Sequence, residues 1–108
     1  MSWKVIFFES ARREKPVEEF FYKQQLQAQS KMLHLFELLQ AYGSQLGMPH
    51  AKQLETGLYE LRARGKEEIR ILYGFKQQTI YLLHAFKKQT QKTPSKEIET
   101  AKKRLTEI

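Results

Sequence analysis

The alternation of apolar and polar positions divides the chain into short strands and longer helical segments. Residues 3–8, WKVIFF, combine β-branched and aromatic side chains over the length of one strand. Three further strand patterns follow in the second half, at residues 58–63 (LYELRA), 68–75 (EIRILYGF) and 79–86 (TIYLLHAF). Their connections are short enough for hairpins, so we expect these three strands to pair antiparallel.

Two helical patterns lie between the first strand and the second. The first begins at Pro16, which suits the opening turn of a helix. Its apolar face comprises Val17, Phe20 and Phe21, and Leu26 extends it. The second follows the polar stretch QAQSK and ends before Gly43, which suits a helix C-terminus. Its apolar residues recur at steps of three and four: Met32, Leu35, Phe36, Leu39 and Tyr42.

A third helix is predicted at the C-terminus, after a loop at residues 43–53 that contains two glycines and a proline. Thr93 is the expected N-cap and Pro94 the first helical residue. The apolar face of this helix comprises Ile98, Ala101, Leu105 and Ile108.

The predicted order is therefore β-α-α-β-β-β-α, in one domain spanning residues 1–108. This order indicates an α+β fold, with a small, partly antiparallel sheet, an N-terminal helical hairpin and a C-terminal helix. We expect the helices to cover one face of the sheet and to leave the other open.

Composition narrows the class of protein. The chain has 108 residues, of which 41% are hydrophobic, and it has no cysteine, which excludes disulfides and cysteine-based zinc sites. No window approaches the run of about eighteen apolar residues that a membrane helix needs. The N-terminus has no cleavage pattern of a signal peptide. We therefore expect a soluble, cytoplasmic protein with no membrane partner.

Charge points to the second half of the chain. The formal net charge is +7, and residues 50–108 hold thirteen of the nineteen basic residues against seven of the twelve acidic ones. A polyanionic partner, above all nucleic acid, is expected on this half. A solvated basic surface that aids solubility is the alternative.

Basic residues also occur where the predicted strands begin and end. Arg70 interrupts an otherwise apolar strand, Arg62 and Arg64 precede the same hairpin, and Lys87 and Lys88 follow the last strand. Guanidinium groups bind phosphate bidentately and stabilise the extra charge of a phosphoryl transition state. One hypothesis is therefore that four of these cations converge on one concave surface, with Arg64 as a further substrate contact. The four are Arg62, Arg70, Lys87 and Lys88.

Two alternatives qualify this hypothesis. Arg70 can instead pair with Glu60 or Glu68 across the hairpin, as an ordinary structural ion pair. Lys87 and Lys88 leave the strand on opposite sides, so only one of them is expected to face the cleft. The other, with Lys92, would support phosphate or partner contacts.

The histidines allow more than one role. Strand alternation places His84 on one face with Ile80, Leu82 and Phe86, where it either acts as a general acid or base beside the lysines or packs half-buried. His50 lies in the loop beside Lys52, where both could contact a substrate. We assign no role to His34.

The chain has no aspartate, no HExxH motif, no carboxylate cluster and no glycine-rich phosphate loop. We therefore expect neither a metal nor a nucleotide cofactor. If the protein cleaves a phosphodiester, it must use groups other than a metal. RNA supplies its own nucleophile, the 2′-hydroxyl, whereas DNA has none, so RNA is the favoured substrate.

Two segments carry a family resemblance: GLYELRARGKEEIRILYGF and IYLLHAFKKQTQKTPSKEIETAKKR. Together with their spacing, the blocks LYELR, RILY and HAFKKQTQKTP resemble the RelE/ParE superfamily of toxin–antitoxin toxins, in its HigB-like, phage-associated branch. The resemblance covers roughly residues 45–105. It implies a RelE-like fold and a toxin that inhibits translation by cleaving mRNA on the ribosome without a metal.

The resemblance also implies roles for single residues. Arg62 and Arg70 occupy positions where the family keeps cations on the central sheet, and Lys87 or Lys88 matches the basic residue after the last strand. The aromatic or histidine expected near the C-terminal end is replaced here by QTQKTP. Tyr73, His84 or His50 would have to substitute for it.

Family members differ in target and share a kind of partner. Members of the ParE side of the superfamily target DNA gyrase rather than RNA. A gyrase inhibitor is therefore one alternative, and a non-catalytic RNA-binding module is another. The expected partners are mRNA, the ribosome and a cognate antitoxin, often a helix-turn-helix protein.

Overall fold

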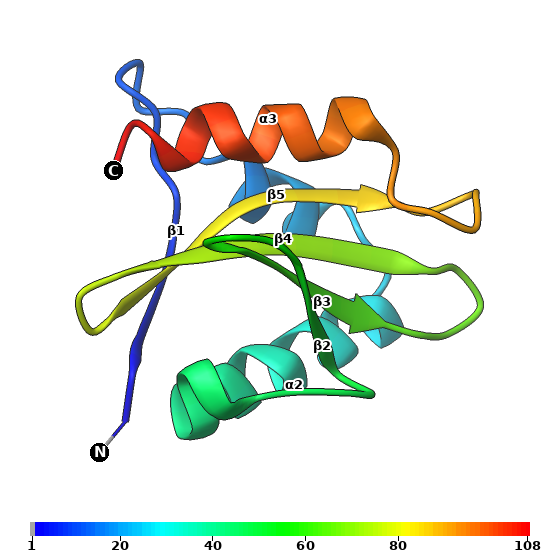
Figure 1. Ribbon diagram of the computed structural model, residues 1–108. Helices are drawn as coiled ribbons and strands as arrows, with labels where there is room; N and C mark the ends of the chain where they lie inside the picture. Colours follow the sequence, from blue (N-terminus) through cyan, green and yellow to red (C-terminus); the bar gives the residue numbers. More distant parts are fainter. Residues whose placement is uncertain (1) are drawn as a thin grey trace.

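Figure 1 shows the computed structural model of the protein, which describes residues 2–108. In chain order its elements are β1 (Lys4–Phe7), α1 (Pro16–Tyr22), α2 (Leu26–Tyr42), the 3₁₀ turn η1 (Gly43–Gln45), β2 (Ala51–Glu55), β3 (Leu58–Ala63), β4 (Ile69–Lys76), β5 (Thr79–Lys87) and α3 (Ser95–Leu105). The α+β class is confirmed. The four predicted strands and three predicted helices are all present.

One strand was not predicted. Within residues 43–53, read from the sequence as a loop, the structure has η1 and the start of β2. Of the β2 side chains only Ala51 is buried, and Leu54 is half-buried. A shift in the pairing of β2 with β3 between Gln53 and Glu55 also interrupts the alternation. Because the strand lacks a regular apolar face, its sequence resembles that of a loop.

The five strands form one mixed sheet in the order β1-β5-β4-β3-β2. β1 runs parallel to β5, and the other neighbours are antiparallel, as expected for the hairpins. β4 therefore lies at the centre between β5 and β3, and β1 and β2 form the two edges.

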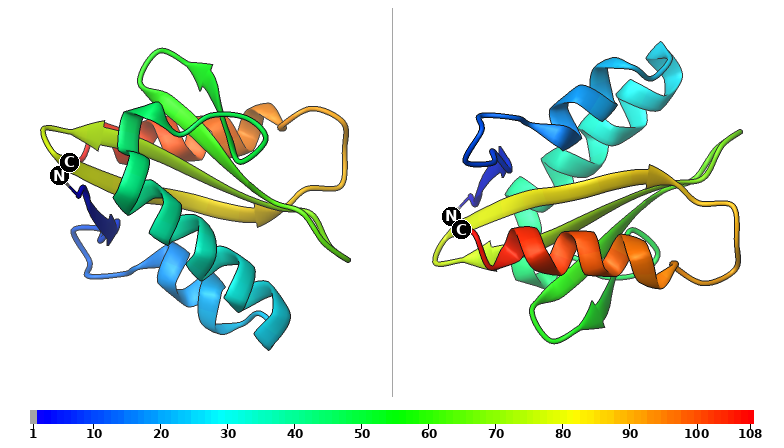
Figure 2. Two further views of the ribbon diagram at one scale, coloured as in Figure 1. Left: turned by 90° about the horizontal axis from the view of Figure 1, so that it is seen from below. Right: turned by 90° about the horizontal axis from the view of Figure 1, so that it is seen from above.

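The helices cover both faces of the sheet, so the prediction of one open face is wrong. α1 and α2 pack on one face and α3 on the other (Figure 2). β4 is buried without interruption from Ile69 to Gly74. A strand with this continuous burial needs cover on both sides, and the apolar run ILY within it is the sequence signal for that cover.

An irregularity in β5 changes which side chains share a face. Leu72 pairs with His84 and Tyr73 pairs with Leu82, so Leu83 is an extra residue. Leu82 joins the core under α1 and α2, whereas Leu83 joins the core under α3. The prediction that His84 shares a face with Ile80 and Leu82 is therefore wrong. His84 faces α3.

The helix boundaries differ from prediction at two N-termini. α2 begins at Leu26, which is 80% exposed and does not extend the apolar face of α1. α3 begins at Ser95 with Pro94 as its N-cap, so Thr93 is not the cap.

None of the helices within residues 2–108 combines the length and apolar character that a membrane crossing needs.

Candidate functional site

A groove of about 650 Å³ lies where β3 and β5 end and β4 begins. Its lining residues are Arg62, Arg64, Glu68, Arg70, Lys88, Gln89, Thr90 and Gln91. The sheet register builds it: Arg62 lies directly opposite Arg70, and the Lys88 amide donates to the Glu68 carbonyl at 2.7 Å. We call this feature the basic groove. It brings together three of the four cations that the sequence predicted to converge.

Arg70 lies at the bottom of the basic groove and is only 3% exposed. Its Nη2 donates to Glu68 Oε1 at 3.0 Å, and its Nη1 donates to the Ile69 carbonyl at 3.3 Å. Its Nε lies 3.6 Å from Glu60 Oε1, close enough for charge attraction but too far for a hydrogen bond. The alternative in which Arg70 pairs across the hairpin is therefore confirmed, with both glutamates.

Glu60 joins three segments beneath the groove. It is 1% exposed, and Arg62 Nε donates to its Oε1 at 3.4 Å. The Thr93 hydroxyl donates to its Oε2. This contact explains why Thr93 is not the cap of α3, because its hydroxyl is used to tie the loop before α3 to β3.

The second carboxylate, Glu68, lines the groove itself. It accepts from Arg70 and lies 3.6 Å from Arg64 Nη1. Burial alone would raise the pKa of Glu68, but the hydrogen bond and charge of Arg70, followed by the charge of Arg64, lower it below its usual value. Three arginines thus share two carboxylates, and Lys88 adds a fourth cation, which leaves the groove with an excess of positive charge.

Lys88 is the groove cation without a carboxylate partner in residues 2–108. Burial and then the charge of Arg70 lower the pKa of Lys88 below its usual value, although Glu60 and Glu68 oppose the shift. A lysine in this setting holds its proton less firmly than a solvated one. Among the four cations of the basic groove it is therefore the one best suited to exchange a proton.

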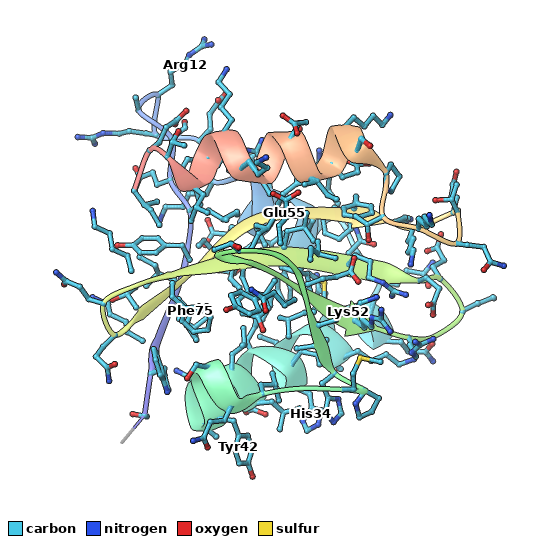
Figure 3. The ribbon with its side chains drawn as sticks, viewed as in Figure 1. Arg12, His34, Tyr42, Lys52, Glu55 and Phe75 are labelled. Carbon is cyan, nitrogen blue, oxygen red and sulfur yellow. The ribbon has the colours of Figure 1, made fainter. Side chains whose placement is uncertain are left out.

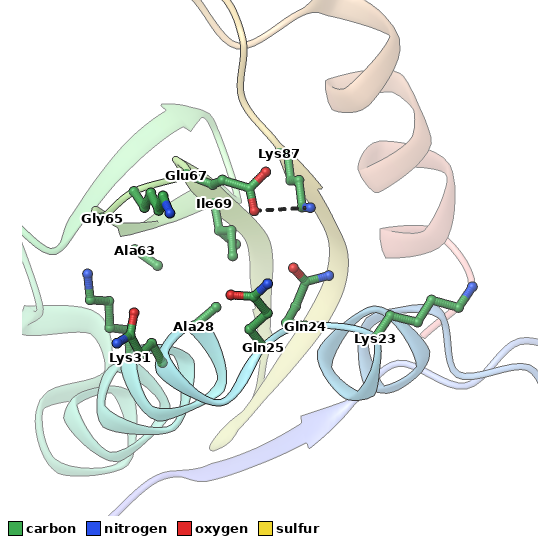
Figure 4. Close-up of a pocket in the computed structure, with 12 residues that line it drawn as sticks. Lys23, Gln24, Gln25, Ala28, Lys31, Ala63, Gly65, Glu67, Ile69 and Lys87 are labelled. Atoms are coloured by element: carbon green, nitrogen blue, oxygen red, sulfur yellow. Dashed lines mark ion pairs between the residues drawn. The ribbon is translucent and has the colours of Figure 1, made fainter.

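Lys87 does not belong to the groove, so the prediction that it shares a surface with Arg62 and Arg70 is wrong. It lies on the α1 and α2 side, in a separate cleft of about 200 Å³ (Figure 4). Its ammonium group pairs with Glu67 at 3.2 Å. The expectation that only one of the two lysines faces the groove is confirmed, and that lysine is Lys88.

His84 connects the sheet to α3. Its Nε2 lies 2.7 Å from Glu97 Oε1, and its Nδ1 lies 3.1 Å from Arg104 Nη1, which also donates to the Leu83 carbonyl at 2.8 Å. Because arginine can only donate, Nδ1 accepts and the Nε2–H donates to Glu97. Both ring nitrogens are occupied and His84 does not line the basic groove, so its position favours the packing alternative.

We expect His84→Ala to destabilise the fold by about 1–3 kcal/mol, because it leaves Glu97 and Arg104 half-buried without a shared partner. Urea denaturation followed by circular dichroism measures this change. A variant as stable as the wild type would contradict the structural role of His84.

The remaining predicted residues are spread around the groove. Tyr73 is 1% exposed and stacks on Tyr59 with ring centroids 5.5 Å apart. The alternative in which Tyr73 contacts substrate in place of the missing aromatic or histidine is therefore wrong. Burial, and then the neighbouring Tyr59, raises the pKa of its hydroxyl. Lys52 is exposed on β2 opposite Glu60 (Figure 3), and Lys92 is exposed in the loop before α3. Neither lines the groove.

His50 lies beside the groove and not in it. Its carbonyl accepts from the Arg62 amide at 2.9 Å. His50 lines a pocket of about 500 Å³ that shares Arg62 and Arg64 with the basic groove.

Sequence reasoning missed the polar segment Gln89, Thr90 and Gln91 as a wall of the groove. The sequence signal for this wall is the run of amide and hydroxyl side chains directly after Lys88. Within residues 2–108, no group of three or more His, Cys, Asp or Glu side chains could hold a metal ion.

Comparison with known proteins gives one family. The model of a family described as phage-derived protein Gp49-like (DUF891) matches residues 19–106. This segment begins within α1, ends just after α3 and contains the whole basic groove. No curated protein matches the chain.

Proposed function

The chain belongs to the phage-derived Gp49-like family, and on this premise we propose that it is the toxin of a type II toxin–antitoxin system. Three findings support the proposal: the RelE-like toxin class of the family, the small α+β fold, and the HAFKKQTQKTP block at the end of β5. We further propose that the protein belongs to the HigB-like branch of the RelE/ParE superfamily. The partner is then a cognate antitoxin, expected to be a helix-turn-helix protein.

The proposed activity is cleavage of mRNA on the ribosome. The observation that carries it is the basic groove, in which three arginines share two carboxylates and Lys88 has no carboxylate partner within the described residues. Its positive excess fits a sugar–phosphate chain. Because the lining combines guanidinium groups with one lysine of lowered pKa, the groove offers both charge stabilisation and a group that exchanges protons.

The chemistry uses the substrate's own 2′-hydroxyl. Its proton passes to the neutral amine of Lys88, and the 2′-oxygen forms a bond to the adjacent phosphorus while the bond from phosphorus to the 5′-oxygen breaks. The 5′-oxygen takes a proton from water. The products are a 2′,3′-cyclic phosphate and a 5′-hydroxyl end. Arg62 and Arg70 supply positive charge where the phosphoryl group gains negative charge.

One observation favours a second function. Arg70 is almost fully buried and held by two glutamates, which limits its direct contact with a phosphate. A non-catalytic inhibitor of DNA gyrase or an RNA-binding module needs only the positive surface, not a reactive arginine. We rank both below the ribonuclease because Lys88 has no carboxylate partner within the described residues and has a lowered pKa.

Two assays with purified protein separate these functions. In a translation extract with a defined message, we expect message fragments with 5′-hydroxyl ends, and in a gyrase supercoiling assay we expect no inhibition. Inhibited supercoiling with an intact message would establish the gyrase function instead. Binding of the message without fragments would support the RNA-binding module.

A further inference from the structure

The pocket beside the basic groove has a lining unlike that of the groove. Leu35 and Ala63 are buried at its bottom, and Pro49, His34 and His50 line it nearer the surface. His34 comes from α2, on the side of the molecule away from α3 (Figure 3). We call this feature the side pocket. Its volume of about 500 Å³ falls within the range of small-molecule sites, about 300–1,000 Å³.

The side pocket adjoins the basic groove at the end of β3, although its buried residues Leu35 and Ala63 belong to the core on the α2 side of the sheet. Arg62 and Arg64, at the end of β3, line both features. An RNA strand bound along the groove would therefore have to pass around the end of β3, over these two arginines, to place a base in the pocket. The hydrogen bond from the Arg62 amide to the His50 carbonyl, at 2.9 Å, fixes the pocket wall to the strand that carries the groove.

The charge around the side pocket also matches that of the groove. Lys31, Arg62 and Arg64 line it, and within residues 2–108 no carboxylate is among its lining residues. The Lys31 ammonium group donates to the Arg64 carbonyl at 2.8 Å, which holds α2 against the end of β3. The pocket therefore combines an apolar bottom with a positive rim.

This combination is suited to a nucleobase whose phosphate lies nearby. Proteins that bind single-stranded RNA stack unpaired bases on imidazole rings, guanidinium planes and apolar side chains, while cations hold the backbone. We propose that the side pocket binds a nucleobase of the RNA whose sugar–phosphate chain occupies the basic groove. The inference rests on the proposed RNA target and adds a base-binding subsite formed by His34, His50, Leu35 and Ala63.

The test is a binding measurement with uncleavable RNA. The probe is a short single-stranded RNA with 2′-O-methyl riboses, made also as a series in which one base at a time is absent. For the wild-type protein we expect one position at which loss of the base weakens binding about tenfold, a usual effect of losing one stacked base. The double variant His34→Ala with His50→Ala should bind the intact RNA as weakly as the wild type binds the RNA that lacks this base. Its affinity should not fall further when the base is absent.

Two further variants control for folding and for general surface effects. His50→Phe keeps an aromatic ring and should retain most of the affinity that His50→Ala loses. Leu33→Ala removes another exposed side chain of α2, which lines a different cleft, and should bind like the wild type. Circular dichroism checks that each variant is folded.

Several outcomes would overturn the inference. One is equal binding of all the abasic RNAs. Another is that the histidine substitutions and the missing base weaken RNA binding independently, so that their two effects on affinity multiply. A third is a pair of histidine substitutions that weakens antitoxin binding and leaves RNA binding unchanged, which would assign the pocket to a protein partner. Failure of the ribonuclease proposal looks different: base-dependent binding would persist while an unmodified message stayed intact.

Discussion

Lys88→Met is expected to slow mRNA cleavage about 100- to 10,000-fold, the usual contribution of a general acid or base. The substitution keeps the length of the side chain and removes the amine that takes the proton of the 2′-hydroxyl. Because Lys88 has no carboxylate partner within the described residues, its loss leaves no buried charge uncompensated. The fold should therefore survive, and the rate of message cleavage in ribosome complexes measures the effect.

Lys87→Met is the matched control, because it removes the same charge from the neighbouring residue on the opposite face of the sheet. Its cleavage rate should stay near that of the wild type. Equal losses in the two variants would show that net charge, and not the position of Lys88, sets the rate.

The lowered pKa of Lys88 also fixes the sign of the pH dependence. The amine acts in its neutral form, so the cleavage rate should rise with pH until the pH reaches the lowered pKa of Lys88, and then level off. Lys88→Arg keeps the charge and cannot release a proton at these pH values, so it should be slow at every pH. A rate that falls as pH rises would instead mean that Lys88 acts as the acid.

Arg70→Met is expected to destabilise the fold by about 3–5 kcal/mol, the usual effect of removing one partner from a buried ion pair. It leaves Glu60, which is 1% exposed, with Arg62 as its remaining ionic partner. Adding Glu60→Gln removes the stranded charge, so the double variant should be more stable than the sum of the two single effects predicts. Urea denaturation of the four proteins gives the coupling free energy.

A coupling below about 0.5 kcal/mol would contradict the arrangement, because independent sites add to within that margin. The expected instability also limits Arg70 as a probe of function. Loss of cleavage after its substitution would combine lost charge at the phosphate with lost folding. Lys88 gives the cleaner answer.

Much of the fold could be predicted from local patterns. β3, β4 and β5 were located because their apolar runs are bounded by turn residues, and α1 because Pro16 begins it. The edge strand β2 was missed because it buries little beyond Ala51 and contains an irregularity. The position of α3 on the second face follows only if both faces of β4 are buried. The continuous burial of β4 from Ile69 to Gly74 shows that they are.

The site was predicted in part for similar reasons. Alternation along β3 and β4 places Arg62 and Arg70 on one face, and the register places them opposite each other. The extra residue Leu83 in β5 shifted the predicted environment of His84, and nothing local in TIYLLHAF reveals it. The link from Thr93 to Glu60 joins segments 33 residues apart and depends on how α3 packs. Such contacts depend on the tertiary structure and not on sequence spacing.

The central claim is that RNA lies in the basic groove, and the salt dependence of binding tests it most directly. With the uncleavable single-stranded RNA, the logarithm of the binding constant should fall linearly with the logarithm of salt concentration. Lys88→Ala and Arg64→Ala should each make that slope shallower by about 0.7, the value for one lost phosphate contact on a single strand. Lys87→Ala, on the opposite face, should leave the slope unchanged. A slope reduced by Lys87→Ala and unaffected by the two groove substitutions would contradict the account.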